Sequence, residues 1–214
     1  IHIPDGVEEI KEFAFEGCTS LTCATIPGSL KVLQKYAFSG CTNLASLNIA
    51  EGVEEIGWSA FKDCTSLTTI TIPGSVKVIH ERAFAGCTNL TNIIISEWVE
   101  AIGKGAFENC VGLTDITIPA SVTSIGNSAF SDCYALKTVI CEAIEVPELG
   151  SSVFYYMPLS EATLYVPAQS LDDYKAAEQW NEFGTILPIE GESEEEIELQ
   201  DTERTIVFTN SEDN

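Results

Sequence analysis

Six cysteines recur at a constant spacing of 23 residues, and this period constrains the fold more than any other feature of the chain. They are Cys18, Cys41, Cys64, Cys87, Cys110 and Cys133. An Ala-Phe pair keeps the same step, ending at Phe15, Phe38, Phe61, Phe84, Phe107 and Phe130. No insertion interrupts the register over about 140 residues. A sustained repeat of this length predicts a solenoid whose units stack around one continuous core.

The fourth unit shows how one coil is built. Ile70 and Ile72 alternate with threonines, which predicts a short strand with one buried face. Pro73 ends that strand because it has no N–H to donate. Residues 76–79 form a second short extended or turn-like stretch, and residues 82–87 have room for short turns or a single helical turn.

The units resemble the BspA-like branch of the leucine-rich repeat family of bacterial surface proteins. The pattern is fullest in Ile118, Pro119, Val122, Ile125, Gly126, Ala129, Phe130, Cys133, Leu136 and Val139. The resemblance covers residues 1–141, or six repeats. It implies a right-handed leucine-rich-repeat superhelix, with a parallel strand ladder on one side and short turns or single helical turns on the other. It also implies an exported protein at the cell surface.

The register breaks after Val139, and residues 142–189 are interpreted as a degenerate repeat followed by a C-terminal cap. Ser170 is a candidate N-cap for an amphipathic helix that covers the last rung. Its apolar stripe is Leu171, Tyr174, Ala177 and Trp180. Residues 184–189 are expected to return as a strand. This region looks like the closing module of Bacteroidetes members of the family.

Residues 190–214 carry ten acidic residues against Arg204 alone. We interpret them as an acidic tail or a linker to a further domain, with residues 205–209 as a strand of that domain. The alternative is a calcium site at Glu194–Glu196, which requires a turn that makes the carboxylates converge. The chain opens inside a repeat without a starting Met, so we expect a processed or excised piece.

The formal net charge of −23 opposes binding to nucleic acid and to anionic lipid, because such binding needs Lys and Arg. No apolar run approaches the roughly 20 residues that cross a bilayer, so we expect no membrane insertion. We expect free thiols rather than disulfides, since a cysteine at one place in every unit behaves as a small buried hydrophobe. Cys23 lies in a polar column and should face solvent.

The sequence offers no pattern that indicates catalysis. His2 and His80 stand outside any ligand motif, and the chain has no phosphate-binding glycine loop, no Gly-x-Ser-x-Gly and no Cys-x-x-Cys. We therefore expect a protein that is not an enzyme and that has no metal or cofactor.

One surface column alternates in charge from unit to unit: Glu8, Lys31, Glu54, Lys77 and Glu100. This alternation reflects a finer period of 46 residues. In a parallel stack it replaces repulsion between like charges by weak attraction.

The outward positions of the strands are almost uncharged and are rich in threonine. The candidate interaction face consists of Thr69, Thr71, Asn92, Ile94, Asp115, Thr117 and Ile140, with Trp98 beside it. The structural alternative is that threonine simply suits exposed strand positions. For Trp58 and Trp98 we favour sideways packing on a neighbouring rung over a role as interface anchors.

The sequence thus predicts a monomeric, non-catalytic module for adhesion or protein interaction. Family members are described as contacting host extracellular proteins or other microbes, so the resemblance implies a host or microbial surface protein, or a glycan, as partner. Two alternatives stay open. One is a passive spacer or scaffold that displays a neighbouring domain, and the other is a glycan-binding accessory module.

Overall fold

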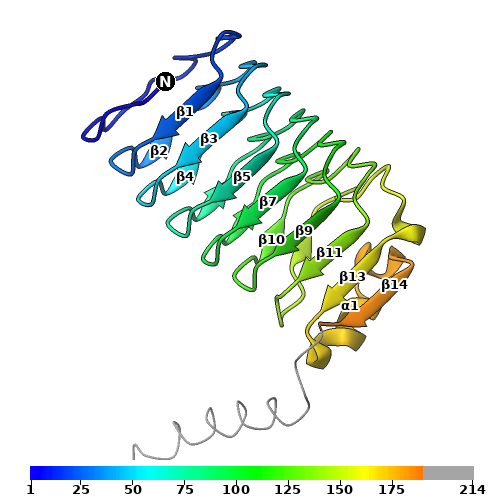
Figure 1. Cartoon of the computed structure of the whole chain (residues 1–214). Coiled ribbons are helices and arrows are strands. Elements are labelled where there is room, and N and C mark those ends of the chain that lie inside the picture. The colour runs from blue at the N-terminus through cyan, green and yellow to red at the C-terminus, as the bar shows by residue number, and fades with distance from the viewer. Residues whose placement is uncertain (190–214) are drawn as a thin grey trace, which may run out of the picture.

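Each unit forms one turn of a parallel β-solenoid, which the computed structural model describes for residues 1–189 as about seven turns (Figure 1). One side carries four-residue strands, one per turn. They are β1 (Cys23–Ile26), β3 (Ser46–Ile49), β5 (Thr69–Ile72), β7 (Asn92–Ile95), β9 (Asp115–Ile118), β11 (Thr138–Cys141), β13 (Thr163–Val166) and β14 (Thr185–Pro188). The predicted solenoid with a parallel strand ladder is confirmed.

A second row of two-residue strands forms a continuous six-stranded sheet in the order β2-β4-β6-β8-β10-β12. Its strands are β2 (Val32–Leu33), β4 (Glu55–Ile56), β6 (Val78–Ile79), β8 (Ala101–Ile102), β10 (Ser124–Ile125) and β12 (Glu148–Leu149). The long strands divide instead into β1-β3, β5-β7 and β9-β11-β13-β14. The two interruptions are two units apart, which matches the 46-residue period of the sequence.

The third side of each coil consists of turns rather than a helical turn. Arg82 and Gly86 have positive φ angles of 56° and 74°, which an α-helix does not accept. Along this side, successive backbone N–H groups alternate between hydrogen bonds to the next rung and hydrogen bonds within the same turn. Those of Arg82, Phe84 and Gly86 bond to carbonyls of the next rung at 2.8–2.9 Å, and those between them close i→i−3 turns. Backbone hydrogen bonds on this side therefore also join neighbouring rungs.

The core is a column of stacked phenylalanine rings. From Phe15 to Phe130 the rings of adjacent units lie 4.9–5.5 Å apart and within 16° of parallel. Phe154 extends the column at 6.0 Å. Trp180 and Phe183 then meet Phe154 edge-on at 5.4 and 5.2 Å, so the C-terminal end of the column is covered.

The C-terminal cap differs from the prediction in its helix. Helix α1 (Leu171–Ala176) has only six residues, and Trp180 lies in the 3₁₀ turn η3 (Trp180–Glu182) beyond it. The Ser170 hydroxyl does not cap the helix, because it donates a hydrogen bond to the Ile144 carbonyl at 2.7 Å. Tyr174 and Trp180 are nevertheless buried over the last rung, as expected. Two further 3₁₀ turns, η1 (Leu159–Glu161) and η2 (Ala168–Ser170), flank β13.

The cap also continues the ladder. Strand β13 pairs with β11, and β14 pairs with β13 in parallel register. The strand expected at residues 184–189 is therefore present. The proposed calcium site at Glu194–Glu196 and the strand expected at residues 205–209 lie outside the described residues.

Replacement of Phe84, in the middle of the ring column, should destabilise the protein strongly. Phe84→Ala removes a fully buried ring that stacks on both sides, so we expect a loss of about 3–5 kcal/mol in the free energy of unfolding. Urea denaturation followed by circular dichroism measures it. Phe15→Ala is the matched control, since Phe15 is partly exposed and stacks on one side. Equal losses for the two variants would contradict a continuous column.

Candidate interaction surface

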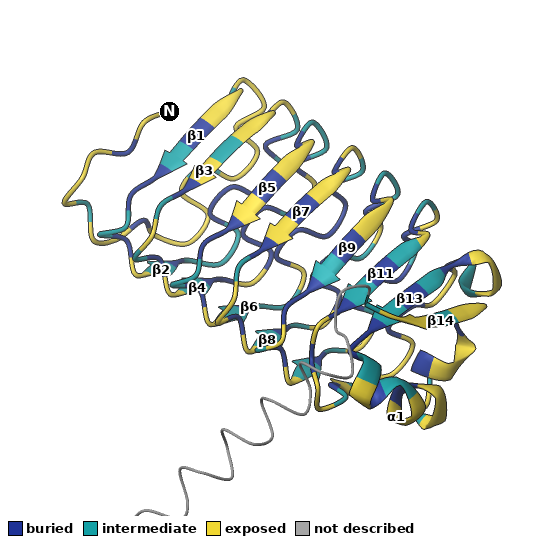
Figure 2. Ribbon diagram, turned by 60° about the horizontal axis from the view of Figure 1, so that its bottom comes forward, coloured by how far each residue is buried: buried dark blue, intermediate teal, exposed yellow. Residues whose placement is uncertain are grey.

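The long strands carry two columns of outward-facing residues, which we call the ladder face. Figure 2 shows more exposed and buried residues alternating along these strands. The first column contains Cys23, Ser46, Thr69, Asn92, Asp115, Thr138, Thr163 and Thr185. The second contains Thr25, Asn48, Thr71, Ile94, Thr117, Ile140, Tyr165 and Leu187. Buried residues alternate with them along each strand, as a strand period of two requires. All predicted residues of the interaction face except Trp98 belong to these columns.

Several polar groups of the ladder face are available to a ligand. Among the described residues, none forms a hydrogen bond with the side chains of Thr69, Thr71, Asn92 or Thr117. Asp115 is the single charged residue of the two columns, and its carboxylate accepts a hydrogen bond from the Thr114 hydroxyl at 2.8 Å. The face therefore offers hydroxyl and amide groups with little net charge, in a chain whose formal charge is −23.

The second column changes character toward the C-terminus. Ile94 is 55% exposed and Leu187 is 41% exposed, while Ile140 and Tyr165 are half-buried. We call these four residues the apolar stripe, which Thr117 interrupts between Ile94 and Ile140. Sequence analysis found the two isoleucines but missed Tyr165 and Leu187. Their strands follow at spacings of 25 and 22 residues, so a strict 23-residue register does not align them.

The two tryptophans make the expected sideways contacts with a neighbouring unit, but these contacts do not bury them. Trp58 and Trp98 are 56% and 64% exposed, although each contacts a neighbouring unit. The Trp58 indole N–H donates to His80 Nδ1 at 3.3 Å. Lys77 Nζ lies 5.3 Å from the centre of the Trp98 ring. Trp98 lies on the turn after β7, and no described contact joins its ring to the ladder face.

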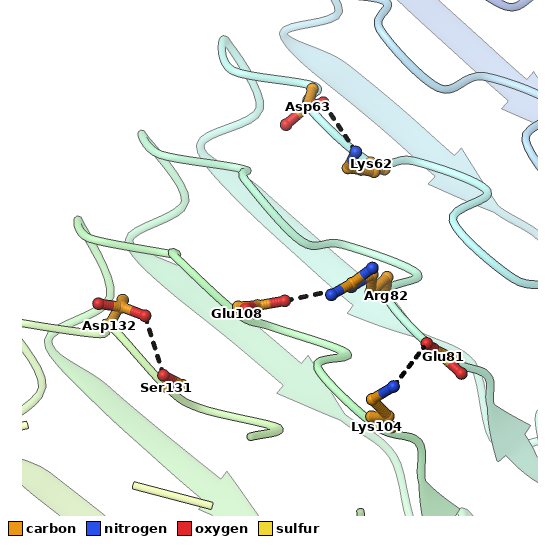
Figure 3. A network of polar contacts seen from close by, with 8 residues as sticks. All are labelled: Lys62, Asp63, Glu81, Arg82, Lys104, Glu108, Ser131 and Asp132. Atoms are coloured by element: carbon orange, nitrogen blue, oxygen red, sulfur yellow. Dashed lines mark hydrogen bonds and ion pairs between the residues drawn. The ribbon is translucent and has the colours of Figure 1, made fainter. Parts of the chain in front are cut away.

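Ion pairs between units lie outside the ladder face, and two of them, Arg82–Glu108 and Glu81–Lys104, are drawn in Figure 3. In the predicted alternating column, Lys31 and Glu54 form a pair at 2.8 Å. Lys77 of that column lies over Trp98 instead. A parallel column that sequence analysis did not identify as alternating contains Glu12–Lys35 at 3.1 Å and Glu81–Lys104 at 3.3 Å. These exposed pairs stabilise the stack weakly.

The buried thiols lack the features of a catalytic nucleophile. Burial raises the pKa of Cys41 to about 11 and that of Cys87 and Cys133 to about 12. A thiol at such a pKa is not a nucleophile near neutral pH. The buried thiols donate instead to phenylalanine carbonyls one unit back, as Cys64 does to Phe38 at 3.3 Å. His80 contacts Glu55 at 2.9 Å.

Residues 1–189 contain no group of three His, Cys, Asp or Glu side chains that is arranged to hold a metal ion. Within the same range, no helix has the length and apolar character needed to cross a bilayer.

The repeat geometry agrees with a known family. The model of the BspA-type leucine-rich repeat region matches residues 1–82 and 55–175 of this chain. The chain belongs to the BspA-type leucine-rich repeat family. The match includes β1 to β13, and therefore most of the ladder face and the first three residues of the apolar stripe.

Solved structures of other leucine-rich repeat proteins share the fold. A leucine-rich repeat protein from T. pallidum is 33% identical, over 74% of this chain and 77% of its own, with a TM-score of 0.67. A leucine-rich repeat protein from Bacteroides ovatus is 22% identical, with a TM-score of 0.57. That alignment covers 88% of this chain and 60% of the Bacteroides protein. No curated protein sequence matches this chain significantly.

Thiol labelling should distinguish the two exposed cysteines from the buried ones. Cys18 lies in the terminal unit of the stack and is exposed, unlike its five equivalents, and Cys23 faces solvent as predicted. We expect Ellman's reagent to modify two thiols in the native protein and all eight after denaturation without reductant. The Cys18→Ala/Cys23→Ala variant serves as control and should show no rapid native reaction. Fewer than eight thiols after denaturation would indicate disulfides.

The buried thiols should make the protein less stable in alkaline solution. Their pKa values lie near 12 for Cys87 and Cys133 in the folded state, against 9.0 for a free thiol. Above pH 9 the unfolded chain therefore binds fewer protons than the folded one. Each such thiol should lower the unfolding free energy by up to about 1.4 kcal/mol per pH unit.

Urea midpoints at pH 7, 8, 9 and 10 measure this alkaline loss. We expect little change between pH 7 and 8 and a clear fall from pH 9 to 10. Cys133→Ala should reduce the slope between pH 9 and 10 while lowering stability at pH 8. A midpoint that is constant up to pH 10 would contradict burial of the thiols.

Proposed function

We propose that this chain is a non-catalytic recognition module of a bacterial cell-surface protein, which binds a partner protein through its ladder face. The observation that carries the proposal is the apolar stripe within a face of unpaired hydroxyl and amide groups. An apolar centre with polar surroundings is the usual anatomy of a protein interface. Exposed strands commonly carry threonine, so threonine on this face needs no functional explanation. Exposed apolar residues such as Ile94 and Leu187 are less expected there, and a binding role explains them.

Trp98 gives a second, independent reason. Its φ angle is +89°, and the equivalent residues Gly6 and Gly52 have 91° and 109°. Glycine adopts such angles freely, whereas a bulky side chain there costs energy. A strained and exposed tryptophan contributes little to the stability of the fold. Such residues are common anchors at protein interfaces.

The location follows from the family resemblance, since BspA-like proteins are described as exported surface proteins. The partner that fits best is an extracellular protein of the host or of another microbe. The exposed stripe disfavours the alternative of a passive spacer, which needs no apolar residues on its surface. A glycan remains the alternative ligand for the hydroxyl-rich N-terminal part of the face.

The test compares binding to arrays of extracellular proteins and glycans before and after loss of the stripe. Ile94→Thr/Ile140→Thr installs the residue that Thr25, Thr71 and Thr117 already provide, so the fold should be kept. We expect affinity for a selected protein to fall at least tenfold, or about 1.4 kcal/mol. Trp98→Gly should weaken binding without loss of stability, because it relieves the strain.

Asn48→Thr, in the same column but far from the stripe, is the matched control and should bind as the parent does. If the arrays show no selective protein binding, the spacer alternative is favoured. If only glycans bind, and the stripe variants bind them unchanged, the accessory-module alternative replaces this proposal.

A further inference from the structure

A hollow of about 690 Å³ lies where the last complete rung meets the C-terminal cap. Its wall includes the turns after β12, and none of its lining residues belongs to a long strand. Phe154 and Met157 contribute buried apolar surface, Tyr155 and Tyr156 line it as exposed rings, and acidic residues of the cap complete it. This hollow is therefore separate from the ladder face.

The two tyrosines form an exposed aromatic pair. Tyr155 and Tyr156 are 53% and 60% exposed, and their ring centres lie 4.0 Å apart. Tyr156 has a positive φ angle of 60°. The equivalent residues of the earlier units, which share this backbone conformation, are Gly17, Gly40, Asp63, Gly86, Asn109 and Asp132. Glycine, asparagine and aspartate adopt a positive φ angle readily, whereas a tyrosine pays a conformational cost at this position. Because the Tyr156 ring is largely exposed, packing in the core does not compensate for that cost.

Carboxylates around the tyrosines have no cationic partner. Glu178 and Glu182 line the hollow and are exposed. Asp132, whose N–H donates to the Tyr155 carbonyl, accepts hydrogen bonds from Ser131 at 2.9 Å and from the Tyr134 hydroxyl at 2.6 Å. Among the described residues, no lysine or arginine forms an ion pair with these three carboxylates. Figure 3 shows this contrast for Asp132, which contacts Ser131, whereas Asp63 has a lysine and Glu108 an arginine.

Net negative charge is also denser toward the C-terminal end of the described chain than in the repeats before it. Residues 142–189 contain eight acidic residues against Lys175 alone. Residues 1–141 contain fifteen acidic residues and eight basic ones, which gives the same net charge of −7 in about three times the length. The segment that supplies Glu178 and Glu182 to the hollow therefore has the higher density of net negative charge.

The walls of the hollow are fixed before any ligand arrives. Gln179 donates to the Gly150 carbonyl at 2.7 Å and accepts from the Val153 N–H at 2.8 Å, which joins the cap to the last rung. Asn127 accepts from the Ser151 N–H at 2.9 Å. A ligand therefore does not have to order these turns, which favours binding.

We propose that this hollow binds an arginine side chain from a basic segment of a protein partner. A guanidinium group stacks on aromatic faces and forms paired hydrogen bonds with carboxylates, and its methylene stem packs on apolar surface. Tyr155 and Tyr156 supply the rings, Glu178 and Glu182 the carboxylates, and Phe154 and Met157 the apolar contact. The unpaired charge favours this occupant over a neutral glycan.

The test uses the full chain and a fluorescent peptide that carries two arginines between glycines. The matched ligand replaces both arginines by citrulline, which keeps the shape and removes the charge. At 150 mM salt we expect saturable binding of the arginine peptide and at least tenfold weaker binding of the citrulline peptide. Tyr156→Asn, which installs the residue found at Asn109, and Glu182→Gln should each weaken binding at least fivefold. Denaturation curves establish that both variants are folded.

Two controls separate this site from general acidity and from the ladder face. Glu9→Gln removes one exposed charge from the first unit and should bind the peptide as the parent does. Trp98→Gly should also leave peptide binding unchanged, so failure of the ladder-face proposal would not affect this one. Equal binding of both peptides, unchanged binding by Tyr156→Asn and Glu182→Gln, or displacement by a neutral oligosaccharide would each overturn the proposal.

Discussion

The structure depends on the direct stacking of equivalent side chains in one column. From Phe38 to Phe130, each phenylalanine packs on the rings of the units before and after it. The buried thiols of the 23-residue series, from Cys41 to Cys133, each donate to a phenylalanine carbonyl of the preceding unit. Such contacts favour a constant spacing, although the step of 24 residues from Phe130 to Phe154 shows that a turn can accommodate one extra residue while the rings still stack. The constant 23-residue step of the sequence is the consequence of this preference.

A column of this kind leaves the outward positions free to vary. The core of each unit is complete when its inward residues are in place, so a change from Thr71 to Ile94 in the same outward column does not disturb it. The ladder face can therefore carry a graded surface, hydroxyl-rich toward the N-terminus and apolar toward β14. The interrupted hydrogen bonding of the long strands is tolerated because the sheet of short strands and the turns also join the rungs.

The sequence predicted the solenoid, the long strands and the buried columns, because a strict period reports contacts between equivalent residues. It predicted less where contacts join residues that are not equivalent. Ser170 has the local pattern of a helix cap, but a tertiary hydrogen bond to Ile144 takes its hydroxyl. Tyr165 and Leu187 join the second outward column only after irregular spacings. The hollow at the cap is likewise formed by residues about 30 positions apart, such as Gly150 and Gln179, whose pairing no local pattern reveals.

Backbone strain connects the two proposed surfaces. Trp98 and Tyr156 each occupy a positive φ angle, and most of their equivalents are glycine or short polar residues. Strain of this kind costs about 1–3 kcal/mol at a single residue. Both rings are more than half exposed, so burial of apolar area offsets only part of that cost within the chain. The simplest physical account is that contacts with a partner compensate for the strain. The two residues lie on different sides of the solenoid. The module therefore has the features of a surface with two separate contacts, in which an apolar ladder face and a negatively charged hollow bind different parts of a partner.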